Sequence, residues 1–85
     1  MSAKRSTATE RGYLREAGGF LRWYRTTYGA AMTVQEFTPA TIERYFAWCR
    51  PRSSPSTQRR RHSALRWFGD WLVQANQIER NPLKS

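Results

Sequence analysis

Apolar residues recur every three or four positions in three stretches of the chain, a spacing that places them on one face of an α-helix. The first stretch begins near Thr7 or Thr9 and ends at about Tyr28. The second covers residues 39–50, and the third covers residues 54–76. No stretch alternates apolar and polar residues as a half-buried β-strand would. The pattern therefore predicts an all-α fold.

The third stretch is the most clearly two-sided. Six residues form its apolar stripe: Leu65, Phe68 and Leu72, with Ala64, Trp71 and Ala75. Four residues line the opposite side: Arg59, Ser63, Arg66 and Asp70. Ser54, Ser56 and Thr57 supply hydroxyl groups that can cap the first turn, and Asn76 is a suitable last residue. We expect a long helix with a core face and a cationic face.

The first stretch predicts an amphipathic helix of about five turns, which Gly29 would end. Its apolar positions are Tyr13, Ala17, Phe20, Leu21, Tyr24 and Tyr28. Gly18 and Gly19 in its middle each cost about 1 kcal/mol relative to alanine. We expect the pair to allow close approach of another helix or backbone, and a local kink is the alternative.

The second helix has clear start and stop signals. Thr38 is a favoured N-cap, Pro39 falls at the first helical position, and Phe37 can pack against Ile42 across the cap. Pro51 requires the helix to end at the residue before it or earlier.

The chain is long enough for one small domain. Its 85 residues would bury roughly 60–65% of the surface of the unfolded chain, which leaves little room for a deep catalytic pocket. We expect a single domain over residues 1–85, with an ordered core at about 7–84. After the third helix, Ile78 and Leu83 are expected to pack on the core. Asn81-Pro82 would begin either a last helical turn or an exit linker.

The charge of the chain is strongly positive. Fifteen Lys and Arg residues against six Asp and Glu residues give a formal net charge of +9, and the isoelectric point is about 11.1. Such an arginine-rich excess favours nucleic acid over an acidic protein or a membrane surface as the partner. No stretch reaches a membrane-spanning length, and the N-terminal residues lack the apolar centre of a secretion signal, so we expect a cytoplasmic location.

The residues that catalysis or metal binding would need are missing. Cys49 is the only cysteine, which excludes an internal disulfide and a multi-cysteine metal site. His62 is the only histidine and has no carboxylate or second ligand nearby in the sequence. We therefore expect no catalytic residue, no metal and no cofactor in this chain.

Arg59, Arg60 and Arg61 crowd the first turns of the predicted third helix, where the positive end of the helix dipole disfavours cations by a few tenths of a kcal/mol each. A requirement other than folding is expected to keep them there. A helix N-terminus attracts anions, and arginines add forked donors that match a phosphate. The cluster predicts a polyanionic partner, and for any single arginine the alternative is an ordinary solvated charge.

Aromatic residues are numerous for so short a chain. Trp23 and Trp71 are expected in the core. Trp67 lies on the same side as Arg60 and is expected to be half exposed, under arginine stems or against a sugar-phosphate backbone. We interpret His62 as a surface residue near phosphates, and a structural role near the helix crossing is the alternative.

Three pieces of the chain carry a characteristic combination of residues. In the first helix, Tyr13 is followed by Phe20-Leu21-Arg22-Trp23-Tyr24. Val34-Gln35-Glu36-Phe37-Thr38-Pro39-Ala40-Thr41-Ile42 then leads to Tyr45 in the second helix. The third piece contains Thr57, Arg60, Ser63-Ala64-Leu65-Arg66, Phe68 and Trp71-Leu72, followed by Ile78-Glu79 and Asn81-Pro82. In this order, over roughly residues 7–84, the chain resembles the N-terminal core-binding domain of tyrosine recombinases, the phage integrases.

The resemblance implies a SAM-like orthogonal bundle of about four helices, in which the first and third cross and face double-stranded DNA. It also implies that the catalytic domain, with its nucleophilic tyrosine, lies outside this chain, so no tyrosine here is expected to be the nucleophile. The predicted DNA contacts are Thr57, Arg59, Arg60, Arg61, His62, Ser63 and Arg66 on the third helix, and Thr9, Arg11 and Arg15 on the first.

On this interpretation the chain is the DNA-binding clamp of a site-specific recombinase, monomeric in isolation, with neighbouring recombinase subunits as further partners on DNA. One alternative is a SAM-like protein-interaction module. Another is a free-standing helix-turn-helix DNA-binding protein, although the proline-rich connector at 50–55 is longer than the usual turn of that motif.

Overall fold

The computed structural model describes residues 7–84, and three α-helices account for most of them. Their bounds are Thr7–Tyr28 for α1, Pro39–Cys49 for α2 and Pro55–Gln74 for α3. The predicted all-α class is confirmed, and each predicted helix is present with its ends within two residues of the expected positions. Among residues 7–84, none of the helices combines the length and the apolar character that a transmembrane span requires.

The helix ends follow the predicted signals. The hydroxyl groups of Thr38 and Ser54 each accept a hydrogen bond from the backbone N–H three residues later, at 3.3 Å in both cases. Gly29 ends α1 in the left-handed region with φ 76°, and Asn76 follows α3 with φ 58°. Local chemistry therefore fixes where the helices start and stop.

Two single 3₁₀ turns shorten the connections between the helices: η1 at Val34–Glu36 and η2 at Arg50–Arg52. The side chain of Glu36 folds back to accept a hydrogen bond from the backbone N–H of Thr33 at 2.8 Å. This bond holds the pKa of the Glu36 carboxyl below its usual value. The hydroxyl group of Thr33 donates to the same carboxylate oxygen at 3.1 Å, so Thr33 and Glu36 together fix the start of η1.

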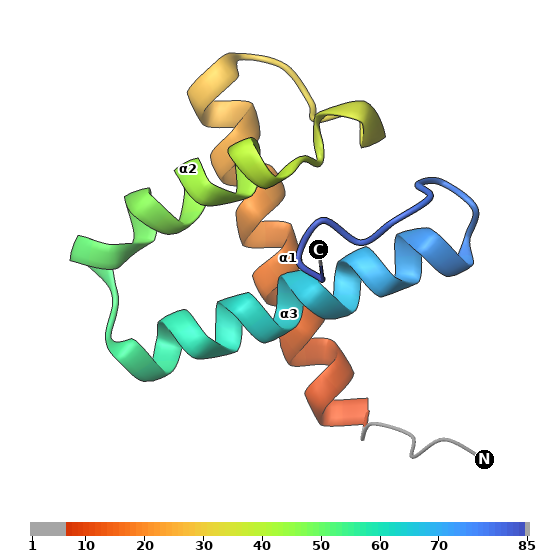
Figure 1. The fold of residues 1–85 in the computed structure, drawn as a ribbon. Coiled ribbons are helices and arrows are strands. Elements are labelled where there is room, and N and C mark those ends of the chain that lie inside the picture. The colour runs from red at the N-terminus through yellow and green to blue at the C-terminus, as the bar shows by residue number, and fades with distance from the viewer. Residues whose placement is uncertain (1–6, 85) are drawn as a thin grey trace.

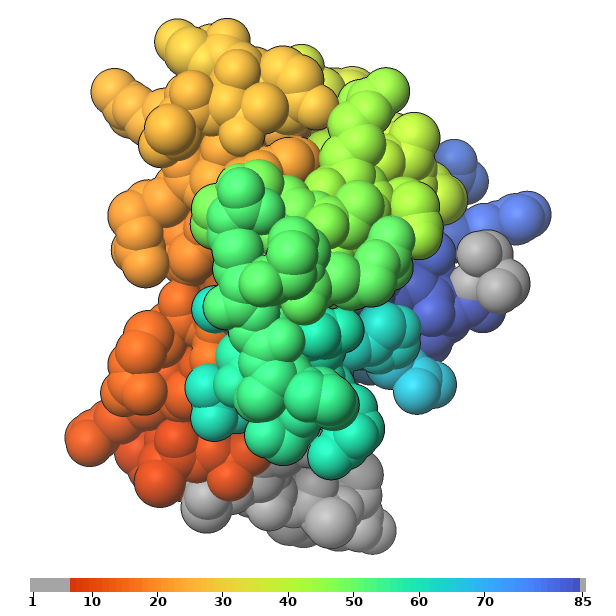
Figure 2. Space-filling model, turned by 90° about the vertical axis from the view of Figure 1, so that its left-hand side faces the viewer, coloured from red at the N-terminus to blue at the C-terminus, as the bar shows by residue number. Residues whose placement is uncertain are grey.

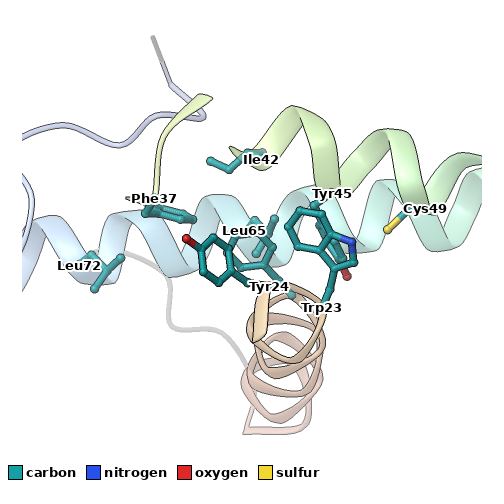
Figure 3. Close-up of a cluster of buried hydrophobic side chains, with 9 residues drawn as sticks. Trp23, Tyr24, Phe37, Ile42, Tyr45, Cys49, Leu65 and Leu72 are labelled. Atoms are coloured by element: carbon teal, nitrogen blue, oxygen red, sulfur yellow. The ribbon is translucent and has the colours of Figure 1, made fainter. Parts of the chain in front are cut away.

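The α2–α3 pair is a hairpin closed by η2, and both of its helices run across α1 (Figure 1). The principal helix contact is between α1 and α3. The core fills the space where the three helices meet (Figure 3). Its buried members are Phe20, Trp23 and Tyr24 from α1, Phe37, Ile42, Tyr45 and Cys49 from α2 and its entry, and Leu65 and Leu72 from α3.

Trp71 is the main error in the predicted core. Its side chain is 53% exposed, and its ring stacks on that of Phe68 at 6.3 Å between centroids. The reason lies in the C-terminal segment, which packs against the Gly69 side of α3 and leaves the Trp71 side uncovered. Leu21 and Tyr28, also assigned to an apolar stripe, are 36% and 44% exposed at the edge of α1.

The segment after α3 folds back along that helix instead of forming a fourth one (Figure 1). Asn81 anchors this segment to α3. The residue is polar but only 7% exposed. Its Nδ2 donates to the carbonyl of Arg66 at 2.8 Å and to Asp70 Oδ1 at 3.1 Å, and its Oδ1 accepts from the N–H of Leu83 at 3.0 Å. The bundle therefore has three α-helices within residues 7–84 where about four were expected.

The packing requires a glycine at position 69, not at 18 and 19. A Cβ at Gly18 or Gly19 would meet its nearest neighbours at 3.7 Å and 3.8 Å, ordinary contact distances, so the predicted close approach does not occur. A Cβ at Gly69 would lie 2.7 Å from Asn81 Nδ2 and closer still to the Cγ and Oδ1 of that side chain. Gly69 thus makes room for the buried asparagine.

Replacement of Gly69 by alanine is expected to destabilise the fold. The added methyl group must displace Asn81 and break its three hydrogen bonds, so we expect a loss of about 1–3 kcal/mol in the free energy of unfolding, measured by urea denaturation. Gly12 is the matched control, because it is helical and a Cβ there meets no atom within 4 Å. Gly12→Ala should stabilise by about 1 kcal/mol. Equal effects at the two sites would contradict this account.

The attachment of the C-terminal segment is expected to depend on pH. The hydrogen bond from Lys84, 2.8 Å from Asp70 Oδ1, lowers the pKa of the Asp70 carboxyl, and the bond from Asn81 lowers it further. Because the folded-state pKa lies below the unfolded value near 3.9, this stabilisation is present above about pH 4 and is lost as the pH falls through the folded-state value.

Amide exchange at Leu83, followed by NMR from about pH 5 to about pH 2, should therefore accelerate at the acid end beyond its intrinsic pH dependence. Asp70→Asn should remove that extra step. An unchanged step in this variant would assign the titration to another carboxyl group.

Candidate nucleic-acid interface

The outer face of α3 carries a cationic row formed by Arg59, Ser63 and Arg66. Their spacing of four and three residues places them on one side of the helix, and all three are exposed. Neither Arg59 nor Arg66 is within salt-bridge distance of a carboxylate in the described part of the chain. We call this set the outer row. The sequence placed four residues on this side; three of them are exposed as predicted, whereas the fourth, Asp70, is half buried and bound to Lys84 and Asn81.

Arg60 and Arg61 face differently, because both are paired with Glu16 of α1. The Nε of Arg60 lies 2.9 Å from Glu16 Oε2, and the Nε of Arg61 lies 3.3 Å from Glu16 Oε1. The Arg60 side chain is 59% exposed, whereas those of Arg61 and Glu16 are 25% and 15% exposed. The three consecutive arginines are therefore not directed as one group, which the sequence alone did not reveal.

His62 lies on the side of α3 that faces α2. It is exposed, and its ring stacks on that of Phe46 at 5.5 Å between centroids and 21° between planes. The two rings border a recess of about 390 Å³ at the corner between α2 and α3. The recess is lined by Phe46, Cys49, Arg50, Pro55, Gln58, Arg59, Arg61 and His62. His62 is therefore at the surface, as the first interpretation expected, and it also packs against another side chain, as a structural role would require.

A groove of about 330 Å³ runs beside the outer row, between α1, α3 and the C-terminal segment. Its lining residues are Tyr13, Ser63, Arg66, Trp67, Asp70 and Lys84. Trp67 is half buried, as predicted, but its ring packs near Tyr13 at 5.9 Å between centroids. Lys84 reaches the groove because Asn81 folds the chain back. Sequence reasoning missed Lys84 and Tyr13, since no local pattern connects them with α3.

The predicted α1 residues Thr9, Arg11 and Arg15 are all exposed. They lie in the first half of α1, which is seen on the same face of the molecule as the first half of α3 in Figure 2. The contacts of this part of α1 reach the middle of α3, where Glu16 binds Arg60 and Arg61 and Tyr13 lies near Trp67. Thr57, by contrast, is half buried and takes part in the cap of α3. Its backbone N–H donates to the Ser54 hydroxyl, and its own hydroxyl accepts a hydrogen bond from that of Ser54.

The electrostatics of the α2–α3 corner are one-sided. Residues 50–66 contain six arginines and no acidic residue: Arg50, Arg52, Arg59, Arg60, Arg61 and Arg66. The N-terminal N–H groups of α3 add to this positive potential. Within residues 7–84, no group of three or more His, Cys, Asp or Glu side chains is placed to hold a metal ion. The arrangement is suited to binding a polyanion.

A second exposed feature is apolar. Leu14 of α1 and Trp71 of α3 are 59% and 53% exposed and border a recess of about 420 Å³ together with Glu10, Trp67 and Phe68. Exposed apolar side chains of this size gain nothing from contact with phosphate groups. This apolar patch is separate in its chemistry from the cationic face.

A comparison with protein families gives a match over most of the chain. The family model described as "Phage integrase, N-terminal SAM-like domain" covers residues 2–79, a range that contains all three helices. No curated protein and no solved structure gives a significant match. The resemblance identified from the three sequence pieces, and the SAM-like class of the helical bundle, are thereby confirmed. The chain belongs to the family of phage integrase N-terminal SAM-like domains, and this membership implies a role in site-specific recombination.

Proposed function

We propose that this domain binds double-stranded DNA and that the outer row of α3 is its main contact. The observation that carries the proposal is the state of Arg59 and Arg66, which are exposed, on one helix face, and not paired with a carboxylate among residues 7–84. Arginines placed in this way keep their hydrogen-bond donors available for phosphate oxygens. Ser63 between them adds a hydroxyl donor.

Two further groups of residues support a surface larger than the outer row. Arg11 and Arg15, with Thr9, would contact the phosphates that flank the α3 contact, because the first half of α1 lies beside α3 (Figure 2). Four residues in the first turns of α3 itself complete the proposed set: Thr57, Arg60, Arg61 and His62. Such contacts fix the position of a protein on DNA more than they read its sequence.

We further propose that the domain acts as the DNA clamp of a tyrosine recombinase, whose chemistry belongs to a separate catalytic domain. The family to which the chain belongs supports this assignment. The domain itself would contribute affinity and orientation, and no step of bond cleavage.

The apolar patch favours a second, compatible function, which is contact with a neighbouring copy of the domain on the same DNA. Leu14 and Trp71 are exposed, and acidic Glu10 lies at the edge of the patch. A second copy carries a formal net charge of +9, so its overall charge complements that edge. A phosphate backbone would have no such complementarity.

The first test is the salt dependence of binding to a fluorescently labelled 30-base-pair duplex. If about four to six phosphates are engaged, log K should fall with log salt with a slope near −4 to −5. Arg59→Gln combined with Arg66→Gln should weaken binding and reduce the magnitude of this slope by about 1.8, because two phosphate contacts are lost.

Arg25→Gln combined with Arg80→Gln is the matched control, since both arginines are exposed and lie outside the proposed surface. This pair removes the same charge and should leave the slope within about half a unit of the wild-type value. A wild-type slope near −1, or equal effects of the two variants, would show that the outer row is not a specific contact.

The second test concerns the apolar patch and measures cooperativity on a duplex long enough for several copies. Leu14→Ser should reduce the Hill coefficient on the long duplex without changing affinity for a duplex that holds one copy. Leu21→Ser is the matched control on the same helix, because Leu21 is also exposed but lies outside the patch. Binding without cooperativity in the wild-type protein would count against contact between copies.

A further inference from the structure

Glu16 is the only carboxylate that pairs with the α3 arginines within the described range, and it binds two of them at once. Each of its oxygens accepts one hydrogen bond from one Nε atom, at 2.9 Å from Arg60 and 3.3 Å from Arg61. We propose that Glu16 is a positioning residue for DNA binding, which holds the guanidinium group of Arg60 in the orientation that receives a phosphate. The inference rests on the proposed DNA-binding function.

The atoms that are used support this role. A guanidinium group has five N–H donors in one plane, and Glu16 engages only the Nε–H of Arg60. One of the four Nη donors is parallel to the Nε–H, the other three point in other directions, and the Arg60 side chain is 59% exposed. The carboxylate therefore fixes the edge that contains Nε and leaves the edge between the two Nη atoms open to a second anion.

The two arginines have different positions and different roles. The Arg61 side chain is only 25% exposed, and it lines the recess beside Cys49 and Phe46 of α2. It thereby holds Glu16 from the inner side and ties together α1, α2 and α3. Arg60 is the outward member of the pair, and its orientation follows from that of Glu16.

Two effects of Glu16 on DNA binding oppose each other. As a negative charge it repels phosphates, but it is flanked by two cations, and at physiological salt charges are screened beyond about 8 Å. As a support it orders the long Arg60 side chain before DNA arrives, which removes an ordering cost equivalent to about 2- to 10-fold in affinity. The positioning effect is therefore expected to be the larger one, and removal of this negative charge should weaken binding to a polyanion.

The experiment compares Glu16→Gln with Glu43→Gln, using the labelled 30-base-pair duplex at physiological salt. Both variants remove one negative charge, but Glu43 of α2 is exposed, forms no salt bridge among residues 7–84 and lies outside both proposed contact surfaces. Glu16→Gln should weaken binding about 3- to 10-fold and reduce the salt slope by about 0.9, the contribution of one phosphate. Glu43→Gln should leave affinity unchanged or raise it slightly.

A double-mutant cycle shows whether Glu16 acts through Arg60. In a background that carries Arg60→Gln, the further change Glu16→Gln should alter affinity less than twofold, because the side chain to be positioned is gone. A purely structural role would lower affinity in both backgrounds by the same factor.

A second variant keeps the proposal testable if Glu16→Gln does not fold. Arg60→Lys retains the charge at an exposed position, but the ammonium group of lysine lacks the planar fork of donors whose orientation Glu16 fixes. It should weaken binding about 3- to 10-fold with unchanged circular dichroism and urea midpoint. Wild-type affinity of Arg60→Lys would overturn the proposal.

The outcomes separate this proposal from the one on which it rests. Tighter or unchanged binding by Glu16→Gln, with weakened binding by the Arg59→Gln and Arg66→Gln pair, would refute the role of Glu16 and leave DNA binding by the outer row intact. Failure of the wild-type protein to bind the duplex would refute both.

Discussion

The structure depends on the aromatic packing that fixes how the α2–α3 hairpin crosses α1. Phe20 is fully buried at this crossing, and its ring lies 5.0 Å from that of Tyr45 and 5.9 Å from that of Phe37. Edge-to-face contacts of this kind have a defined geometry, so they set the direction of the helices as well as holding them together. That direction brings Glu16 of α1 within reach of two arginines of α3 and leaves the outer row facing solvent.

The small core has room for few polar groups, and each one that is buried has a structural use. Burial raises the pKa of the Tyr45 hydroxyl, so that this group stays neutral in the core. Asn81 is another example, since its three hydrogen bonds attach the C-terminal segment to α3. The absence of a side chain at Gly69 makes this attachment possible. The same segment brings Lys84 to the groove beside Arg66, so an ordinary packing feature also shapes the cationic surface.

Some arginines of α3 form contacts that stabilise the fold, and others on the same helix remain available for binding. Arginines near a helix N-terminus oppose the helix dipole, and α1 compensates two of them with a single carboxylate. One carboxylate between two guanidinium groups leaves a net positive charge, so compensation does not abolish the attraction for a polyanion. The outer row has no carboxylate within salt-bridge distance among residues 7–84, although Asp70 lies near enough to Arg66 to interact with its charge. The surface is thus graded, from the paired Arg61 near the core to the unpaired Arg59 in solvent.

The sequence by itself determined the helices, their ends and the family, because caps, prolines and apolar spacing act over a few neighbouring residues. Thr38, Ser54 and Gly29 fulfilled their expected roles for this reason. Only the tertiary structure decided that Trp71 stays exposed, that Gly69 is the essential glycine, and that Arg60 and Arg61 bind Glu16. The contacts of Gly69 and Glu16 join residues that are at least 12 positions apart in the sequence. The exposure of Trp71 depends on which side of α3 the C-terminal segment covers. A helical pattern shows which residues share a face, but the partner of that face is set by how whole helices cross.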